Sequence, residues 1–449
     1  MKKWIIIITT IFLLAILAAG FWTYKTFFYT TPLTQQELKG LTPDWTKATN
    51  GNWSPWHTEP DGTKTWNPAA SFNDWVADIP KHDKAWPTLI DIRYENWDLV
   101  LNQSIGSTPE DGEYWDEVIE LLKLQDIQKI ITQYSELLQR PYMGCGLYNG
   151  TWTRMAGDPV STTRKTRDPD EFAAMKQHGV DSAELVGNGV ANLDLRSVDL
   201  SPAGMLRSIA NLLTSDAYYE FLNGNQDRFV ELQDIISMST RFSDEFPSYL
   251  YQLASLSIEG QSNGSIHWAL NQSTKFNEAQ LVNLDKILAR HENRSLLWEG
   301  ESLEFHDTVR RLVNSNGKLI SHDYENRVGD LIGKQFNGTD LELDPSVQSL
   351  IMVHDSKQKL LSLSISPSEQ DLTDEINVFV NRERPLLNRR AELLLSHQIS
   401  TLSLIRDDFV KHRFESRELR MKIATQRHTL RHASPPASQS DIDPDLLPN

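Results

Sequence analysis

The chain has 449 residues, a formal net charge of −17 and a single cysteine, Cys145. The acidic excess disfavours a nucleic-acid partner, and one cysteine excludes both an intramolecular disulfide and a cysteine-based metal cluster. The length leaves room for two or three domains, and 39 % apolar residues are ordinary for a chain with a globular core.

The stretch from Trp4 to Trp22 contains no charged residue. As an α-helix it would be about 28 Å long, enough to cross the hydrocarbon core of a bilayer. Lys2 and Lys3 precede it and aromatic residues follow it, which predicts a cytoplasmic N-terminus. We therefore expect residues 1–29 to form a cytoplasmic stub and a transmembrane signal-anchor, with residues 4–22 in the lipid bilayer. The alternative is a signal peptide cleaved after residues 17–20.

The main domain is then extracytoplasmic. A large extracytoplasmic domain without a disulfide suits a bacterium better than a eukaryotic secretory protein. The sequence therefore predicts a single-pass protein of the bacterial inner membrane.

Residues 30–80 are rich in proline, glycine, asparagine and threonine, which predicts an irregular juxtamembrane segment. Tryptophans are spread through it, at Trp45, Trp53, Trp56, Trp66 and Trp75. We expect them to pack the segment onto the following domain. The alternative is an aromatic surface that binds a sugar or a protein partner.

Residues 81–200 are predicted to form a helical subdomain with a Gly-rich loop region. Apolar spacing indicates helices over 82–104, after the helix-start signal at 107–111, and from Gln125 to Gln139. The glycines around Cys145 lack the order of a phosphate-binding loop.

Residues 201–313 give the clearest helical pattern and are predicted to be a helical-hairpin core. Pro202 opens one helix, and Asn223-Gly224-Asn225 ends it with a left-handed cap. A second helix follows directly, which predicts an antiparallel hairpin. Further helices are expected from Tyr249 and through Leu281 to Leu288.

The hairpin has tetratricopeptide-like features, namely Ala217, a glycine in the turn and an aromatic residue at Phe229. No second copy follows at the 34-residue period of that repeat. The predicted fold class is therefore mainly α: one N-terminal transmembrane helix, then a tetratricopeptide-like domain built from unequal helices.

Residues 314–433 are predicted to be mixed at first and then a long basic helical segment. From Arg382 to Arg431 there are twelve Arg and Lys against six acids. Such a face either touches anionic lipid or an acidic partner, or it pairs with acids of the same chain. Residues 434–449 have the composition of a disordered tail.

Part of the chain is similar to a known group of proteins. The residues concerned are Leu206-Arg-Ser-Ile-Ala-Asn-Leu-Leu, Ala217, Gly224-Asn225, Pro247, Leu250, Leu253, Leu284, Leu288, Gly300-Glu301 and, upstream, Ala85-Trp86-Pro87. With them, residues 206–313 resemble membrane-anchored helical proteins of unknown function from planctomycetes and related bacteria. The resemblance implies a helical extracytoplasmic domain behind an anchor, and it carries no catalytic residue.

His-Asp dipeptides suggest a possible metal site. They occur at His82-Asp83, His306-Asp307, His322-Asp323 and His354-Asp355. The best grouping combines His291, His306, Asp307, His322 and Asp323, with Glu301 or Glu304 as a base. The spacing follows no ligand rule, and the histidine pair His428 and His432 lacks the glutamate of H-E-x-x-H and borders the predicted disordered tail. We predict no metal and no cofactor, and keep His306, Asp307, His322 and Asp323 as the alternative.

Nucleophilic chemistry has one formal match, since Gly260, Ser262 and Gly264 fit the G-x-S-x-G elbow. That motif needs a strand before it and a helix after it, whereas a helical pattern precedes it here. We expect a Gly-rich turn between helices. Cys145 has no recognisable base beside it.

These patterns predict a scaffold or partner-binding module of the cell envelope, bound to an envelope protein and not to nucleic acid. The alternative function is an envelope hydrolase with a divalent-metal site near His306 and His322.

Overall fold

The computed structural model describes residues 53–92, 106–147, 165–185, 201–294 and 389–448, together with Gly20, with gaps at 55, 59–60, 167, 180–183, 242–244, 247–248 and 273–275. One compact unit combines Trp45–Glu301 with Asp407–Asn449. The second unit combines Met1–Asp44 with Ser302–Arg406 and is described only at Gly20 and in the helical backbone of 389–406. The first unit is thus discontinuous in the sequence.

The described residues are mainly helical, as predicted. The helices are α3 (Pro68–Asp78), α5 (Glu113–Leu122), α6 (Gln125–Leu137), α7 (Pro169–Gln177), α8 (Ser201–Leu222), α9 (Gln226–Met238), α11 (Tyr249–Asn271), α12 (Glu278–Asn293) and α17 (Arg389–His432). Residues 86–92 are also helical. Strands β1 (Trp56–Thr58) and β2 (Lys64–Trp66) pair antiparallel, and β3 (Lys165–Thr166) and β4 (Glu184–Leu185) pair parallel.

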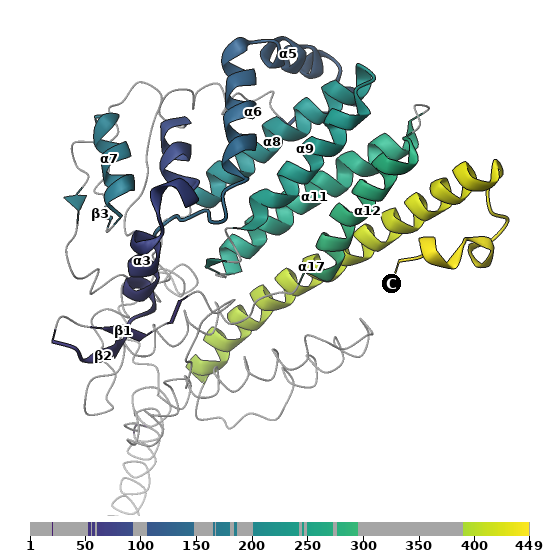
Figure 1. Ribbon diagram of the computed structural model, residues 1–449. Helices are drawn as coiled ribbons and strands as arrows, with labels where there is room; N and C mark the ends of the chain where they lie inside the picture. Colours follow the sequence, from purple (N-terminus) through teal and green to yellow (C-terminus); the bar gives the residue numbers. More distant parts are fainter. Residues whose placement is uncertain are drawn as a thin grey trace, which may run out of the picture. The chain divides into compact units, whose positions relative to one another are not determined.

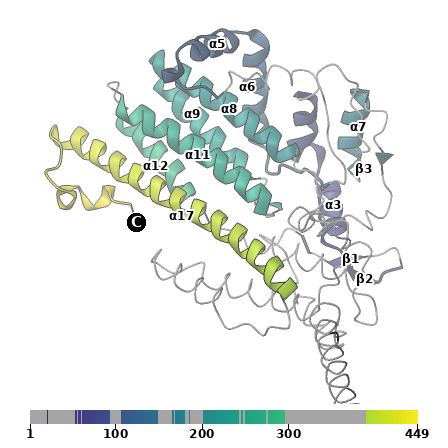
Figure 2. The ribbon, with the colours of Figure 1, turned by 180° about the vertical axis from the view of Figure 1, so that it is seen from behind.

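Helices α8, α9, α11 and α12 form a stack, in which the hairpin of α8 and α9 packs on the hairpin of α11 and α12 (Figure 1). Helix α8 packs against α9 and α11, and α9 packs against α12. The described part of α17 from residue 407 lies along α11 and α12, to which its side chains are hydrogen-bonded. Figure 2 shows the same order from behind. We call α8, α9, α11 and α12 the helix stack.

The connection between α8 and α9 confirms the predicted cap. Gly224 has a φ of +81°, the left-handed conformation that glycine adopts without steric cost. The side chain of Asn225 then caps α9 by accepting a hydrogen bond from the backbone N–H of Arg228 at 3.3 Å. One residue therefore ends the first helix and the next begins the second.

Aromatic rings fill the end of the stack beside this turn. Phe221 packs edge-on against Phe229 and Trp268, with ring centroids 5.4 Å apart in both pairs. Phe276, just before α12, completes the group. These rings join all four helices into one core.

Residues 30–80 are less irregular than predicted, because α3 lies within them. Asn67 caps this helix and Pro68 occupies its first turn, where a missing N–H costs nothing. Trp53 is a core residue: it packs against Phe72 and Phe246 at centroid distances of 5.2 and 6.1 Å. For Trp53 the packing interpretation is confirmed.

The predicted disordered tail is folded onto α17 from residue 434 to 448, so this prediction was wrong. Ala433 has a φ of +56°, which reverses the chain directly after α17. Two short 3₁₀ turns follow, Gln439–Asp441 and Pro444–Leu446. Ile442, which lies between the two turns, and Leu446, the last residue of the second turn, are buried against Ala424 of α17. The average composition concealed these two apolar anchors.

The predicted anchor, residues 4–22, lies outside the described residues except for Gly20, which is helical. Within the described ranges, none of the helices has the length and apolar character needed to cross a bilayer.

Candidate functional site

Of the proposed metal ligands, His306, Asp307, His322 and Asp323 lie outside the described residues. His291, from the same grouping, is described and is 4 % exposed. It lies on α12, inside the interface with α9 and α11.

Both ring nitrogens of His291 are hydrogen-bonded. Nε2 lies 3.0 Å from the hydroxyl of Ser237 on α9, and Nδ1 lies 3.0 Å from Oδ1 of Asn263 on α11. The amide of Asn263 donates in turn to Ser416 Oγ on α17 at 3.0 Å, and Ser416 donates to the carbonyl of His412. We call Ser237, His291, Asn263 and Ser416 the polar relay.

The polar relay works with a neutral imidazole, which accepts at one nitrogen and donates at the other. Burial, reinforced by Arg290 and Arg294, lowers the pKa of His291 to about 3. A metal ion could bind His291 only by breaking one of its two hydrogen bonds. The relay is therefore a connection between four helices, and His291 is removed from the metal grouping.

The serine of the G-x-S-x-G pattern is not at an elbow or in the Gly-rich turn that we expected. Gly260, Ser262 and Gly264 all lie within α11. Ser262 is fully buried and its hydroxyl donates to Gln233 Oε1 at 2.8 Å. A Cβ on Gly260 would lie 2.6 Å from Cε1 of His412, so this glycine permits the close approach of α17. The pattern serves helix packing.

A second group of buried polar residues surrounds the Gly-rich loop. Lys84 is completely buried, and its Nζ lies 3.0 Å from Asp168 Oδ1 and 3.5 Å from Asp170 Oδ2. Asp168 also caps α7 by accepting from the N–H of Asp170. Burial raises the pKa of Asp168 against the opposing effect of Lys84. The pair attaches α7 to the segment before residue 86.

Glu245 binds the loop itself. Its carboxylate accepts hydrogen bonds from the N–H groups of Met143 at 2.5 Å and Gly144 at 3.0 Å. Gly144 has a φ of +62°, and a Cβ there would lie 2.8 Å from Lys84 Cγ. We call Lys84, Asp168 and Glu245 the charged hub. Cys145, next in the chain, is fully buried, where a thiol is poorly placed to react with a substrate.

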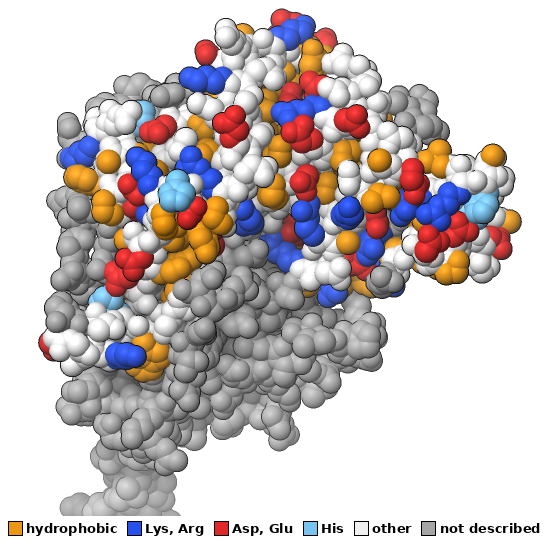
Figure 3. All heavy atoms as spheres, in the orientation of Figure 1, with side chains coloured by type: hydrophobic (Ala, Val, Ile, Leu, Met, Phe, Trp, Pro, Cys, Tyr) orange, Lys and Arg blue, Asp and Glu red, His pale blue; other side chains and the backbone are white. Residues whose placement is uncertain are grey.

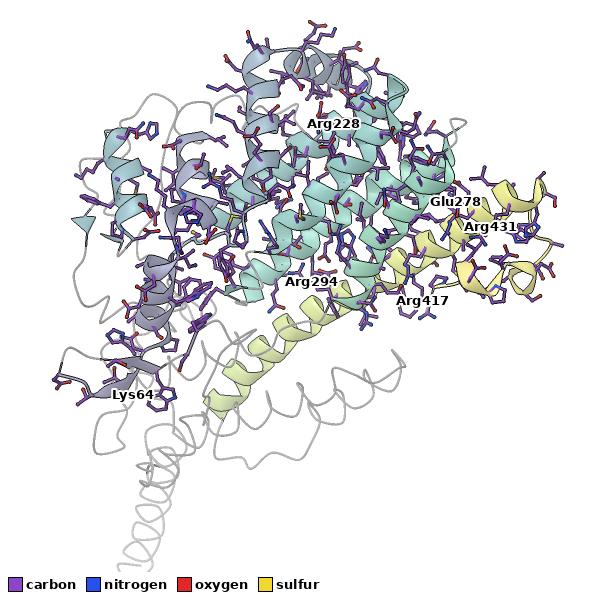
Figure 4. All side chains as sticks on the ribbon, in the orientation of Figure 1. Lys64, Arg228, Glu278, Arg294, Arg417 and Arg431 are labelled. Carbon is purple, nitrogen blue, oxygen red and sulfur yellow. The ribbon has the colours of Figure 1, made fainter. Side chains whose placement is uncertain are left out.

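The basic face of α17 pairs with acids of the same chain. Arg420 contacts Asp285 at 2.8 Å and Glu292 at 2.6 Å, and Arg427 contacts Glu278 at 2.7 Å. Figure 4 shows Glu278 of α12 and Arg431 of α17 beside each other. For these arginines the intrachain interpretation is confirmed.

The last turn of α17 and the folded tail bring together His428, His432 and Asp443. The ligand atoms of these three side chains all lie within 4.8 Å of one another. His432 Nε2 is 3.1 Å from Asp443 Oδ1, and His428 Nδ1 is 3.6 Å from the same oxygen. His428 Nδ1 is buried and has no hydrogen-bond partner among the described residues. We call these three residues the His-His-Asp cluster.

Neighbouring charges hold the carboxylate of the cluster in place. Arg431 Nη1 lies 3.3 Å from Asp443 Oδ2 and 2.8 Å from Asp445 Oδ2. The hydrogen bond from His432 lowers the pKa of Asp443. The sequence revealed the histidine pair at four residues, but its third member was hidden in a segment predicted to be disordered.

Comparison with protein-family models, curated proteins and solved structures gave no match for this chain. The similarity to planctomycete membrane-anchored proteins therefore stays a prediction.

Proposed function

We propose that this protein is a membrane-anchored scaffold of the bacterial cell envelope that binds a partner protein through its helix stack. The observation that carries the proposal is the packing order, in which α8 packs on α11 while α9 packs on α12. In helical repeat proteins, the first helices of successive hairpins pack together, as do the second helices. Such stacks offer extended surfaces that bind proteins.

The tetratricopeptide-like part of the proposal concerns topology and not repeat length. The first hairpin begins at Ser201 and the second at Tyr249, a longer spacing than the 34 residues of that repeat. Long helices and unequal connections are compatible with a solenoid, since each unit needs only its neighbours for packing.

The exposed side of α9 and α12 is the proposed binding surface. Glu231 of α9 and Asn283 and Lys286 of α12 are exposed there, and Arg290 forms an ion pair across the two helices with Asp234. Acidic and basic side chains alternate over this side of the molecule (Figure 3). A surface of mixed charge favours a polar protein partner of complementary pattern.

The membrane anchor is proposed from the uncharged stretch at residues 4–22 and the preceding Lys2 and Lys3. Full-length chain should sediment with membranes and resist carbonate washing, whereas a chain lacking residues 1–29 should be released. Release of both forms by carbonate would contradict the anchor. A periplasmic reporter fused after residue 448 should be active if the main domain is extracytoplasmic.

Partner binding is tested by placing a photo-crosslinking amino acid at Asn283 or Glu231 in the full-length chain, in the producing cells. The matched control carries the same amino acid at Lys64, which is exposed on β2 outside the helix stack. We expect one discrete adduct at the stack positions and none at Lys64. Identical adduct patterns at all three positions, or no adduct at any, would overturn the binding proposal.

A further inference from the structure

We propose that the His-His-Asp cluster is a binding site for a divalent transition-metal ion such as Zn²⁺, which fastens the C-terminal tail to the end of α17. This inference is independent of the scaffold function. It assigns a ligand to residues that belong neither to the charged hub nor to the polar relay.

The distances fit a metal ion. Zn²⁺ binds imidazole nitrogen and carboxylate oxygen at about 2.0–2.2 Å, so two ligands of a tetrahedral ion lie about 3.4 Å apart. The separations from Asp443 Oδ1 are 3.1 Å to His432 Nε2 and 3.6 Å to His428 Nδ1. An ion could therefore enter with small side-chain shifts, leaving a fourth position for water.

The donor set also fits. Two imidazoles and one carboxylate suit the borderline ions of the first transition series. His428 Nδ1 is a buried nitrogen without a hydrogen-bond partner in the described chain, and such an atom is costly unless something binds it. Its ring lies against that of His432, with centroids 4.3 Å apart.

Asp443 faces the histidines with both of its oxygens. His432 Nε2 lies 3.1 Å from each oxygen, Oδ1 is also 3.6 Å from His428 Nδ1, and Oδ2 is held by Arg431 at 3.3 Å. Outer partners of this kind orient a metal ligand. On binding, His432 would ligate through Nε2 with its single ring proton on Nδ1, so a neutral His432 changes tautomer and only a protonated His432 releases a proton to solvent.

The surrounding charge favours a cation. The charged groups within ion-pair distance of the cluster or of Arg431, from α12, α17 and the tail, are Glu278, Arg431, Asp443 and Asp445, and Arg427 shares Glu278. With neutral histidines these groups carry one net negative charge. The site also lies at the C-terminus of α17, where the helix dipole favours positive charge.

The backbone conformation of the turn after α17 indicates that contacts with surrounding residues fix this turn. Ala433 adopts a φ of +56° between His432 and the tail, a left-handed conformation that is strained for a residue with a Cβ. Such residues persist where surrounding contacts over-determine the backbone. The cluster spans this turn, with two members before it and one after it.

The test uses the full-length chain in detergent, without a polyhistidine tag, stripped with chelator and dialysed. Zn²⁺ is titrated by calorimetry, and Co²⁺ is followed by its visible absorption. We expect one equivalent of Zn²⁺ to bind and Co²⁺ to give an intense visible spectrum of low coordination number. Binding should weaken as the pH is lowered, because the ligands bind a metal ion in their deprotonated form.

The variants are His432→Gln and Asp443→Asn, at partly exposed positions where folding is checked by circular dichroism. Each should weaken Zn²⁺ binding by more than about tenfold, since even outer-shell partners contribute that much. The control is His82→Gln, a histidine with an 83 % exposed side chain beside Asp83, which should bind as the parent does.

A second measurement follows the tail itself. Zn²⁺ should slow proteolytic cleavage between residues 433 and 448 in the parent chain but not in Asp443→Asn. The proposal is overturned if no Zn²⁺ binds, or if binding is equal in the parent and in both ligand variants. A tail whose protection depends on pH alone would instead assign the cluster to a histidine–aspartate ion pair.

Discussion

The charged hub and the polar relay both bury polar groups, but they do so for different reasons. In the hub, Glu245 accepts from the backbone N–H groups of Met143 and Gly144, which lie in an irregular loop. In the relay, His291 and Asn263 are hydrogen-bonded to each other and to the side chains of Ser237 and Ser416 on neighbouring helices. The helices satisfy their own backbone, so charge is not needed there.

The difference between the charged hub and the polar relay shows that the backbone groups of a buried loop need hydrogen-bond partners from side chains. A buried loop leaves N–H and C=O groups without partners, and each costs free energy comparable to a lost hydrogen bond. A carboxylate or ammonium group can satisfy several at once, but it must then be paired itself. A neutral relay avoids that desolvation and instead specifies which helices lie together.

The hub should therefore be the more sensitive region. We expect Lys84→Met to lower the free energy of unfolding by about 3–5 kcal/mol, because it leaves Asp168 as a buried charge without its lysine. Urea denaturation measures the change. The control is Lys123→Met, which removes an exposed pair with Glu120 and should change stability by less than about 1 kcal/mol. Similar losses in both variants would remove the distinction between the hub and the surface.

Asp216 on α8 tests the opposite case, a carboxylate buried in the helix stack that accepts a hydrogen bond from the neutral amide of Gln128 at 3.5 Å. Burial, and then Glu220, raise its pKa to about 6. Between pH 4 and pH 6 the carboxyl of Asp216 keeps its proton in the folded chain but loses it in the unfolded chain. The stability that the protonated carboxyl contributes is therefore fully present below about pH 4 and is lost as the pH rises to 6. We expect Asp216→Asn to gain up to about 3 kcal/mol on the parent between pH 4 and 7, at about 1.4 kcal/mol per pKa unit.

The comparison of Asp216→Asn with the parent is made by urea denaturation at each pH. The advantage of the variant should level off above pH 7. A constant difference across the range would mean that Asp216 is ionised in the folded chain at pH 4, and that its burial is compensated by groups such as Gln128.

The polar relay predicts the reverse pH dependence. The pKa of His291 is lowered to about 3, so the stability it contributes is present above pH 6.5 and is lost as pH falls towards 3. Between pH 7 and pH 5 the parent should lose about 2 kcal/mol relative to His291→Gln. At pH 7 the variant should be the less stable of the two. Equal acid sensitivity would mean that His291 is protonated in the relay.

Most helices could be predicted from the sequence, because their apolar residues recur at three and four and their ends carry local signals. Gln125 begins α6 as predicted, and Gly224 has the predicted positive φ. The hub could not be predicted, since Lys84 and Asp168 are far apart in the chain and nothing in a local pattern marks a lysine as buried. Its only sequence signal was the group of glycines, which allow close approach.

The His-His-Asp cluster was half predictable for the same reason. His428 and His432 lie on one helix and are recognised by spacing. Asp443 reaches them only because Ile442 and Leu446 anchor a short segment whose average composition is typical of disorder. Two buried residues in fifteen are too few to change such an average.

The smallest predicted effect is a difference in stability between two glycine variants of the helix stack. One glycine, Gly224, is needed for its backbone conformation, and the other, Gly264, is not. Gly224 has a φ of +81° and open space around its Cα, so Gly224→Ala should cost about 1 kcal/mol through backbone strain alone. Gly264, in the interior of α11, also has open space but helical backbone. Gly264→Ala should therefore stabilise the chain by about 0.5–1 kcal/mol. Thermal melting of the two variants should shift in opposite directions, and a shared direction would show that the turn at Gly224 can rearrange without cost.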